Sequence, residues 1–168
     1  MDSSLPIRGL PPILDGQTKC LVLGTIPGAE SLKRKEYYAN PRNQFWRITE
    51  ALFGINHTST YSERKRELLG RGIGLWDVLE SCDRLGSADG KIRNPKINCL
   101  DTFLDTHSSI KAVFFNGKRP RRLVKSLMSR PLDEKRYGLV VLPSSSSSNT
   151  RYSLTEKVEI WKVLKQCH

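Results

Sequence analysis

The chain has 168 residues, a length that fits one compact domain with a single core. Its 38% hydrophobic content excludes a disordered chain, and its apolar runs are too short to cross a membrane. With 28 Lys and Arg against 17 Asp and Glu, the net charge of +11 favours a polyanionic partner, although a solvated basic surface would give the same count. The N-terminus lacks the basic start and long apolar stretch of a secretory signal, so we expect an intracellular protein, cytoplasmic or nuclear, with no membrane partner.

The first half of the chain predicts two strands and two helices. Lys19–Leu23 is a short apolar run ending at Gly24, which predicts a buried strand. Residues 43–53 place their apolar side chains on one helical face and stop at Gly54. Ser62 precedes a charged run that predicts an exposed, capped helix, and residues 73–78 predict a second strand or the approach to one.

The second half continues the alternation. The predicted elements are a short helix at 99–104, a buried strand at 110–115, a helix at 121–128, a strand at 138–142 and an amphipathic helix at 155–166. Strands separated by helices indicate a parallel sheet covered on both faces. We therefore predict an α/β fold, a three-layer α/β/α arrangement with a short, mostly parallel central sheet. The whole chain forms one domain in this prediction, with residues 1–18 and 152–168 peripheral to the core that carries the motifs.

The four cysteines are isolated in the sequence. Cys20, Cys82, Cys99 and Cys167 contain no CxxC pair, so we expect buried or half-buried free thiols, with no zinc or iron–sulfur site. The His, Asp and Glu residues do not cluster at ligand spacing either, and we expect neither a metal nor a cofactor.

Three segments that follow predicted strands carry the residues of a candidate site. Gly24-Thr25-Ile26-Pro27-Gly28 makes a tight turn whose backbone can approach a flat ligand, although an ordinary strand-exit turn would look the same. It lacks both the GxGxxG fingerprint and the Lys-Ser/Thr ending of a phosphate loop.

The second segment, residues 37–46 (YYANPRNQFW), combines adjacent aromatics, amides and an arginine. A site that binds an extruded base needs this mixture: an aromatic ring to stack on, amides to read an edge, and a charge near phosphate. Tyr38, Arg42 and Asn43 are the candidates here. The alternatives are a plain N-cap for Asn43 and ordinary core or surface aromatics.

The third segment is a serine run after the last predicted strand. Ser144, Ser145, Ser146, Ser147 and Ser148 precede Asn149 and Arg151. A serine run is usually a flexible linker, but between a buried strand and a helix a tethered loop is favoured. Hydroxyls and free amides are suited to gripping phosphates, and Arg151 adds charge.

Further candidates are weaker. The basic residues of 118–136 are Lys118, Arg119, Arg121, Arg122, Lys125, Arg130, Lys135 and Arg136. Lys118, Arg121 and Arg122 would track a DNA backbone if this helix lies near the site, and a solvated basic face is the alternative. Asn116 is either a base contact or a turn residue before Gly117. Asp77, Asp89 and Asp101 could include a functional carboxylate, but exposed turn or cap roles are favoured.

Together, GTIPGAESL, YYANPRNQFW and LPSSSSSN resemble the uracil-DNA glycosylase superfamily, in this order and on strand-exit loops. The resemblance is best to the hypoxanthine-DNA glycosylase (DNA-deoxyinosine glycosylase) branch, which is similar to the mismatch-specific uracil-DNA glycosylases. GIGLWDVLESC, GSAD and VFFNGK extend it over roughly Cys20–Asn149. It implies a monofunctional DNA repair enzyme that flips out deaminated bases and hydrolyses them from the sugar. Hypoxanthine would be preferred, with uracil possible, and an abasic site remains.

The resemblance also assigns roles to residues. Mismatch-specific enzymes carry a catalytic Asn two residues after the first glycine of GTIPG, where this chain has Ile26, which cannot orient water. The hypoxanthine branch is similar in this respect and is thought to use the Asn of its PRN segment. This is Asn43 here, which we predict to position the attacking water. Tyr38 matches an aromatic that stacks on the flipped base, residues 24–28 line the base pocket, and the serine loop grips the DNA.

Two other functions are open from the sequence. Ile26 leaves room for a catalytically inert nucleic-acid-binding protein on the same fold. A small-molecule α/β enzyme using the same loops is disfavoured by the basic charge and by the missing cofactor fingerprint. The expected partner is DNA containing a deaminated base, bound by a monomer that cleaves no strand, since no lysine stands in a recognisable nucleophile motif.

Overall fold

The computed structural model describes residues 6–168. Residues 1–5, the start of the tail predicted to be peripheral, lie outside that range. The centre is a four-stranded sheet in the order β3 (Ile73–Asp77), β2 (Cys20–Gly24), β6 (Ala112–Asn116) and β7 (Gly138–Leu142). Every neighbouring pair is parallel, so the four strands end at one edge of the sheet.

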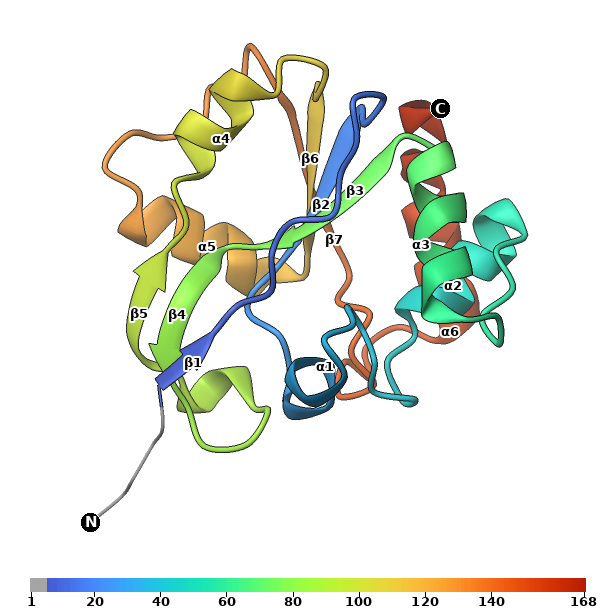
Figure 1. Cartoon of the computed structure of the whole chain (residues 1–168), viewed down its shortest axis with the longest axis horizontal. Helices are drawn as coiled ribbons and strands as arrows, with labels where there is room; N and C mark the ends of the chain where they lie inside the picture. Colours follow the sequence, from blue (N-terminus) through green and yellow to red (C-terminus); the bar gives the residue numbers. More distant parts are fainter. Residues whose placement is uncertain (1–5) are drawn as a thin grey trace.

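The two faces of the sheet bury alternate side chains of the same strands. In β2, Cys20 and Val22 point into one apolar cluster and Leu21 and Leu23 into the other. Figure 1 shows α2 (Phe45–Phe53), α3 (Tyr61–Gly70) and α6 (Leu154–Trp161) on one face, and α4 (Leu100–Thr106) and α5 (Lys118–Leu127) on the other. The predicted three-layer α/β/α fold is confirmed.

A second, smaller sheet was not predicted. It is antiparallel, in the order β1 (Pro6–Arg8), β4 (Leu79–Asp83) and β5 (Arg93–Ile97). Its strands contain few apolar residues and include charged residues and prolines, so they lack the pattern of a buried strand. β4 follows β3 after one residue, and the chain beyond it, with the short helix η1 (Asp89–Lys91), returns to the carboxyl edge of the large sheet.

Two helices differ in detail from the prediction. The short α1 (Ala29–Arg34) follows GTIPG directly and was not predicted. The N-cap of α3 is Thr60 and not the predicted Ser62, because Thr60 and Glu63 form a reciprocal capping box.

The end of the chain corrects two predictions. Residues 152–168 are not peripheral, because α6 and the 3-10 helix η2 (Lys162–Cys167) bury Trp161 and Leu164 completely. Cys20 and Cys167 are not free thiols but form a disulfide between β2 and η2. Cys82 is a buried free thiol as predicted, whereas Cys99 is free but exposed. In the part of the chain that the structure describes, no helix is long and apolar enough to span a bilayer.

Candidate active site

A cavity of about 300 Å³ opens at the carboxyl edge of the parallel sheet. All three predicted segments meet there. The predicted residues that line it are Gly24, Thr25, Ile26, Pro27, Gly28, Tyr38, Asn43, Asn116, Ser144, Ser145, Ser146 and Ser148. They converge because loops after parallel strands share one edge of the sheet.

Gly24 ends β2 at a place where a side chain has no room. A Cβ at this position would lie 2.5 Å from a carboxylate oxygen of Asp77 and 3.4 Å from the hydroxyl of Tyr38. The glycine thus lets the backbone approach the cavity closely. Ile26 is buried in the apolar core, so the polar groups of this turn are its backbone and the Thr25 hydroxyl.

The two adjacent tyrosines have different surroundings. Tyr37 is buried, and its hydroxyl donates to the carbonyl oxygens of Leu10 and Pro11. Tyr38 has a positive φ of 55°, which is uncommon for a residue other than glycine and is often found at functional sites. Its ring stacks on Phe45 with centroids 4.1 Å apart, and burial raises the pKa of its hydroxyl, which stays neutral.

Asn116 is fully engaged by its neighbours. Its Nδ2 donates to the hydroxyls of Tyr38 at 3.1 Å and Ser145 at 2.9 Å, and its Oδ1 accepts from the Ser145 backbone N–H at 2.8 Å. Both amide hydrogens are therefore used within the protein. Asn116 therefore holds Tyr38 and Ser145 in place and has no amide hydrogen left to donate to a base.

The same network orients Asn43. The Ser145 hydroxyl donates to Asn43 Oδ1 at 2.9 Å, and the Phe45 backbone N–H donates to the same oxygen at 2.9 Å. A carbonyl oxygen has two lone pairs, so both are occupied. Asn43 therefore offers the cavity its Nδ2 donors and not its acceptor.

Asp77 is an unexpected member of the site. It ends β3 opposite Gly24, is only 5% exposed and lines the cavity, and its Oδ2 has no hydrogen-bond partner within the described residues. Burial raises the pKa of its carboxyl to about 7, the negative charge of Asp89 adds to the rise, and Arg84 opposes it. The favoured turn or cap role is wrong for Asp77.

Arg84 and Asp89 support this side of the cavity. Arg84 is buried, and its guanidinium donates to the carbonyl oxygens of Gly86 at 2.8 Å and Pro27 at 2.6 Å. This links the chain after β4 to the GTIPG turn. Asp89 also lines the cavity. The pKa of its carboxyl is raised by burial, although a hydrogen bond with Thr25 opposes part of the rise.

The serine loop is tethered, as predicted. Lys157 of α6 is buried and donates to the Ser146 carbonyl at 3.2 Å and to Gln44 at 2.7 Å, and Asn149 donates to the Ser144 carbonyl at 3.1 Å. These contacts hold the loop against the start of α2.

The remaining predicted residues lie outside the cavity lining. Arg42, Ser147, Arg151, Lys118 and Arg122 are exposed. Arg121 differs, because it pairs with Glu134 at 2.6 Å and lies over the Phe115 ring. In the same basic segment Arg130 and Arg136 pair with Asp105, so part of its positive charge is neutralised.

Comparisons with known proteins agree with this site and fold. The profile of the Uracil DNA glycosylase superfamily matches residues 11–165. The chain belongs to the uracil DNA glycosylase superfamily. This confirms the predicted family and, with it, a DNA glycosylase, a hydrolase of N-glycosidic bonds with DNA as its partner.

Individual relatives of this superfamily cover nearly the whole chain. A hypoxanthine DNA glycosylase of Methanosarcina acetivorans is 34% identical over 158 residues, which is 94% of this chain and 96% of the relative. One of Methanosarcina barkeri is 35% identical over 155 residues, 92% of this chain and 94% of the relative. The solution NMR structure of a candidate uracil DNA glycosylase from Methanosarcina acetivorans has a TM-score of 0.79 at 33% identity, covering 96% of this chain and 99% of that one.

Proposed function

We propose that this glycosylase excises hypoxanthine from DNA, acts as an intracellular monomer, and takes the extruded base into the cavity at the edge of the sheet. One observation carries the proposal: the buried carboxyl of Asp77 and the amide donors of Asn43, unoccupied within the described residues, line the same cavity. The names of the relatives support hypoxanthine as the base.

Deamination changes the edge of a base in a way that Asp77 can read. It replaces the amino group of adenine by a carbonyl and converts the neighbouring ring nitrogen from an acceptor to an N–H donor. An ionised, otherwise unpartnered carboxylate accepts from that N–H, whereas the lone pair of adenine would leave it unsatisfied and buried. Uracil carries the same N–H next to a carbonyl, which allows it as a second substrate.

Tyr38 would hold the plane of the base. Phe45 covers one side of its ring, and both residues belong to the segment that forms the cavity wall. An extruded base costs a few kcal/mol of unstacking, least for mispaired bases such as hypoxanthine, and stacking on an aromatic ring recovers part of that cost.

Asn43 would act on the departing base. As the C1′–N9 bond breaks, its electron pair stays with the base, and water supplies a hydroxyl to C1′ and a proton to the released base anion. The Nδ2 donors of Asn43 would stabilise the negative charge that develops on the base, as donors of an oxyanion-type site do. This replaces the predicted role of positioning the water, because Oδ1, the atom that would accept from water, is occupied by Ser145 and Phe45.

Two substitutions of Asn43 test this proposal on duplexes that contain one hypoxanthine or one uracil. Asn43→Ala should lower the single-turnover rate by 100-fold or more, in line with the loss of one such donor. Asn43→Asp should be equally damaging, because it keeps the acceptor and removes the donors. The exposed Gln17→Ala is the matched control and should excise at the wild-type rate.

The outcomes separate the alternatives. Activity retained by Asn43→Asp and lost by Asn43→Ala would restore the water-positioning role. Release of uracil alone would show that uracil, and not hypoxanthine, is the preferred base. A wild-type protein that binds the duplex and releases neither base would favour the inert binder and refute the proposal.

A further inference from the structure

A second cavity, of about 290 Å³, lies directly beside the candidate active site. Tyr38, Asn40 and Asn43 line both cavities, so residues 38–43 form the wall between them. The other residues that line it are Arg34, Glu36, Ala39, Pro41, Trp46, Arg47, His57 and Arg64. We call it the arginine cavity.

Positive charge reaches the arginine cavity from three helices. Arg34 ends α1, Arg47 lies on the exposed side of α2, and Arg64 lies on α3. Glu36 is the one carboxylate among the lining residues, and it pairs with Arg34 at 3.4 Å. Arg47 and Arg64 therefore face the cavity without a carboxylate of its lining paired to them.

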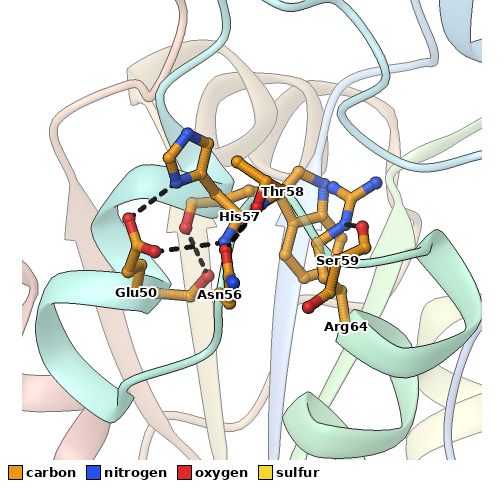
Figure 2. Close-up of polar contacts among 8 residues, drawn as sticks. Glu50, Asn56, His57, Thr58, Ser59 and Arg64 are labelled. Atoms are coloured by element: carbon orange, nitrogen blue, oxygen red, sulfur yellow. Dashed lines mark hydrogen bonds and ion pairs between the residues drawn. The ribbon is translucent and has the colours of Figure 1, made fainter.

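Arg64 is held in place but only partly satisfied. Its Nε donates to the Ser59 carbonyl at 3.1 Å, and its guanidinium carbon lies 4.6 Å from the centre of the Trp46 ring (Figure 2 shows the Ser59 contact). Within the described residues this is the one hydrogen bond of the guanidinium. Burial lowers the pKa of Arg64, as expected for a cation that has lost part of its water.

The connection between α2 and α3 is fixed by side chains at the rim. His57 Nδ1 lies 2.7 Å from Glu50 Oε2, and Asn56 Oδ1 accepts from the Thr58 backbone N–H at 2.9 Å. In Figure 2 the second ring nitrogen of His57 points away from Glu50. The hydrogen bond from His57 lowers the pKa of Glu50, and the nearby charge of Arg47 lowers it further, although within the described residues Glu50 pairs with His57 and not with Arg47.

We propose that the arginine cavity binds a phosphodiester of the DNA strand next to the flipped nucleotide. The proposal rests on the proposed function, because the base must occupy the neighbouring cavity. Flipping rotates a nucleotide about its own backbone, so the adjoining phosphates stay at the mouth of the base pocket. Guanidinium groups match phosphate oxygens in charge and geometry, and those on rigid helices lose little freedom on binding.

The test measures binding to a duplex with an uncleavable abasic analogue, which requires no catalysis. Arg47→Gln removes one charge from the cavity without disturbing the Trp46 contact of Arg64. It should weaken binding several-fold and reduce the slope of log K against log salt by about 0.9, the value for one phosphate. Arg66→Gln is the control, because Arg66 is exposed on α3 and two residues from Arg64, so it points to the other side of the helix.

Methylphosphonates then identify the phosphate. Replacing the phosphates around the lesion one at a time should reveal one position whose replacement weakens wild-type and Arg66→Gln binding clearly more than that of Arg47→Gln. An Arg47→Gln protein with the wild-type slope, or with wild-type sensitivity at every position, would overturn the proposal. Base release that fails in the wild type would refute the proposed function and leave this result standing.

Discussion

Ser145 is the residue on which the geometry of the site depends most. It is fully buried, and its hydroxyl accepts from Asn116 and donates to Asn43, residues 29 and 102 positions away in the sequence. Because the hydroxyl is used in both directions, Ser145 has nothing left to offer a phosphate. Ser144, Ser146 and Ser148 also line the cavity, and because the hydroxyls of Ser146 and Ser148 lie 2.8 Å apart, one of them donates to the other.

Asp77 yields a prediction about substrate recognition. Asp77→Asn replaces a charged acceptor with a neutral amide of the same shape, and charged hydrogen bonds are stronger by about 1 kcal/mol or more. We expect kcat/KM for hypoxanthine to fall about fivefold or more. Wild-type kcat/KM should rise with pH through about 7, where the Asp77 carboxyl ionises, and the variant should lack this rise. A variant with the wild-type profile would exclude Asp77 from recognition.

The same variant should be more stable than the wild type at high pH. The pKa of Asp77 rises from 3.8 to about 7 on folding, so the native protein holds a proton that the unfolded chain loses in that range. The free energy of unfolding of the wild type should therefore decrease as pH rises from about 4 to 7. Asp77→Asn avoids this loss, and urea titrations at pH 8 should show it more stable by a few kcal/mol, with a smaller difference near pH 4.

Which residues line the cavity was only partly predictable from the sequence. Asn43 and Tyr38, which both line it, were recognisable as candidates because amides and aromatics stand together before a helix. Asp77 was not, because an aspartate at the end of a strand is usually an exposed turn residue, and the charged and aromatic neighbours of its carboxyl, Arg84, Asp89 and Tyr38, come from other parts of the chain. Nothing in five consecutive serines indicates which one is buried.

At the scale of elements, the strands of the parallel sheet were predictable and those of the small antiparallel sheet were not. β2 and β6 are continuous apolar runs, which is typical of a central parallel strand. β4 and β5 carry charged residues on a small sheet with one apolar side, and β5 includes Pro95. Their formation depends on pairing with each other, a long-range effect that local patterns do not show.

Helix α5 carries a prediction about DNA binding. Its first residue, Lys118, follows Gly117, whose added Cβ would lie 3.1 Å from the Ser144 side chain, so the helix starts beside the serine loop. Lys118 and Arg122 lie one turn apart and are both exposed. Reversing both charges to Glu should weaken DNA binding at least tenfold and lower the salt slope by up to about 1.8, or 0.9 for each phosphate lost.

Arg130, which follows α5 in the sequence, provides the control for that measurement. Arg130 pairs with Asp101 and Asp105, so Arg130→Gln should change the salt slope much less. Equal slopes for all three proteins in fluorescence anisotropy would remove α5 from the DNA interface. The sequence shows the basic run, but it does not show which of its charges are paired.

At the scale of the whole molecule, the Cys20–Cys167 disulfide joins the first strand of the large sheet to the end of the chain. The two cysteines are 147 residues apart, and no spacing rule predicts such a pair. A disulfide that closes a loop of this length restricts the unfolded chain and stabilises the fold by up to about 5 kcal/mol on the loop-entropy account. It also fixes η2, which buries Leu164 beside the core.

Cys167→Ser tests this contribution. We expect the variant to melt at least several degrees below the oxidised wild type in calorimetry, because the unfolded chain regains its freedom. Dithiothreitol should lower the melting temperature of the wild type by a similar amount and leave that of the variant unchanged. Cys99→Ser, which removes an exposed free thiol, is the control and should melt as the wild type does. Since the disulfide lies in the core and does not line the cavity, base release at 25 °C should survive reduction, and its loss there would show that the site depends on the closed chain.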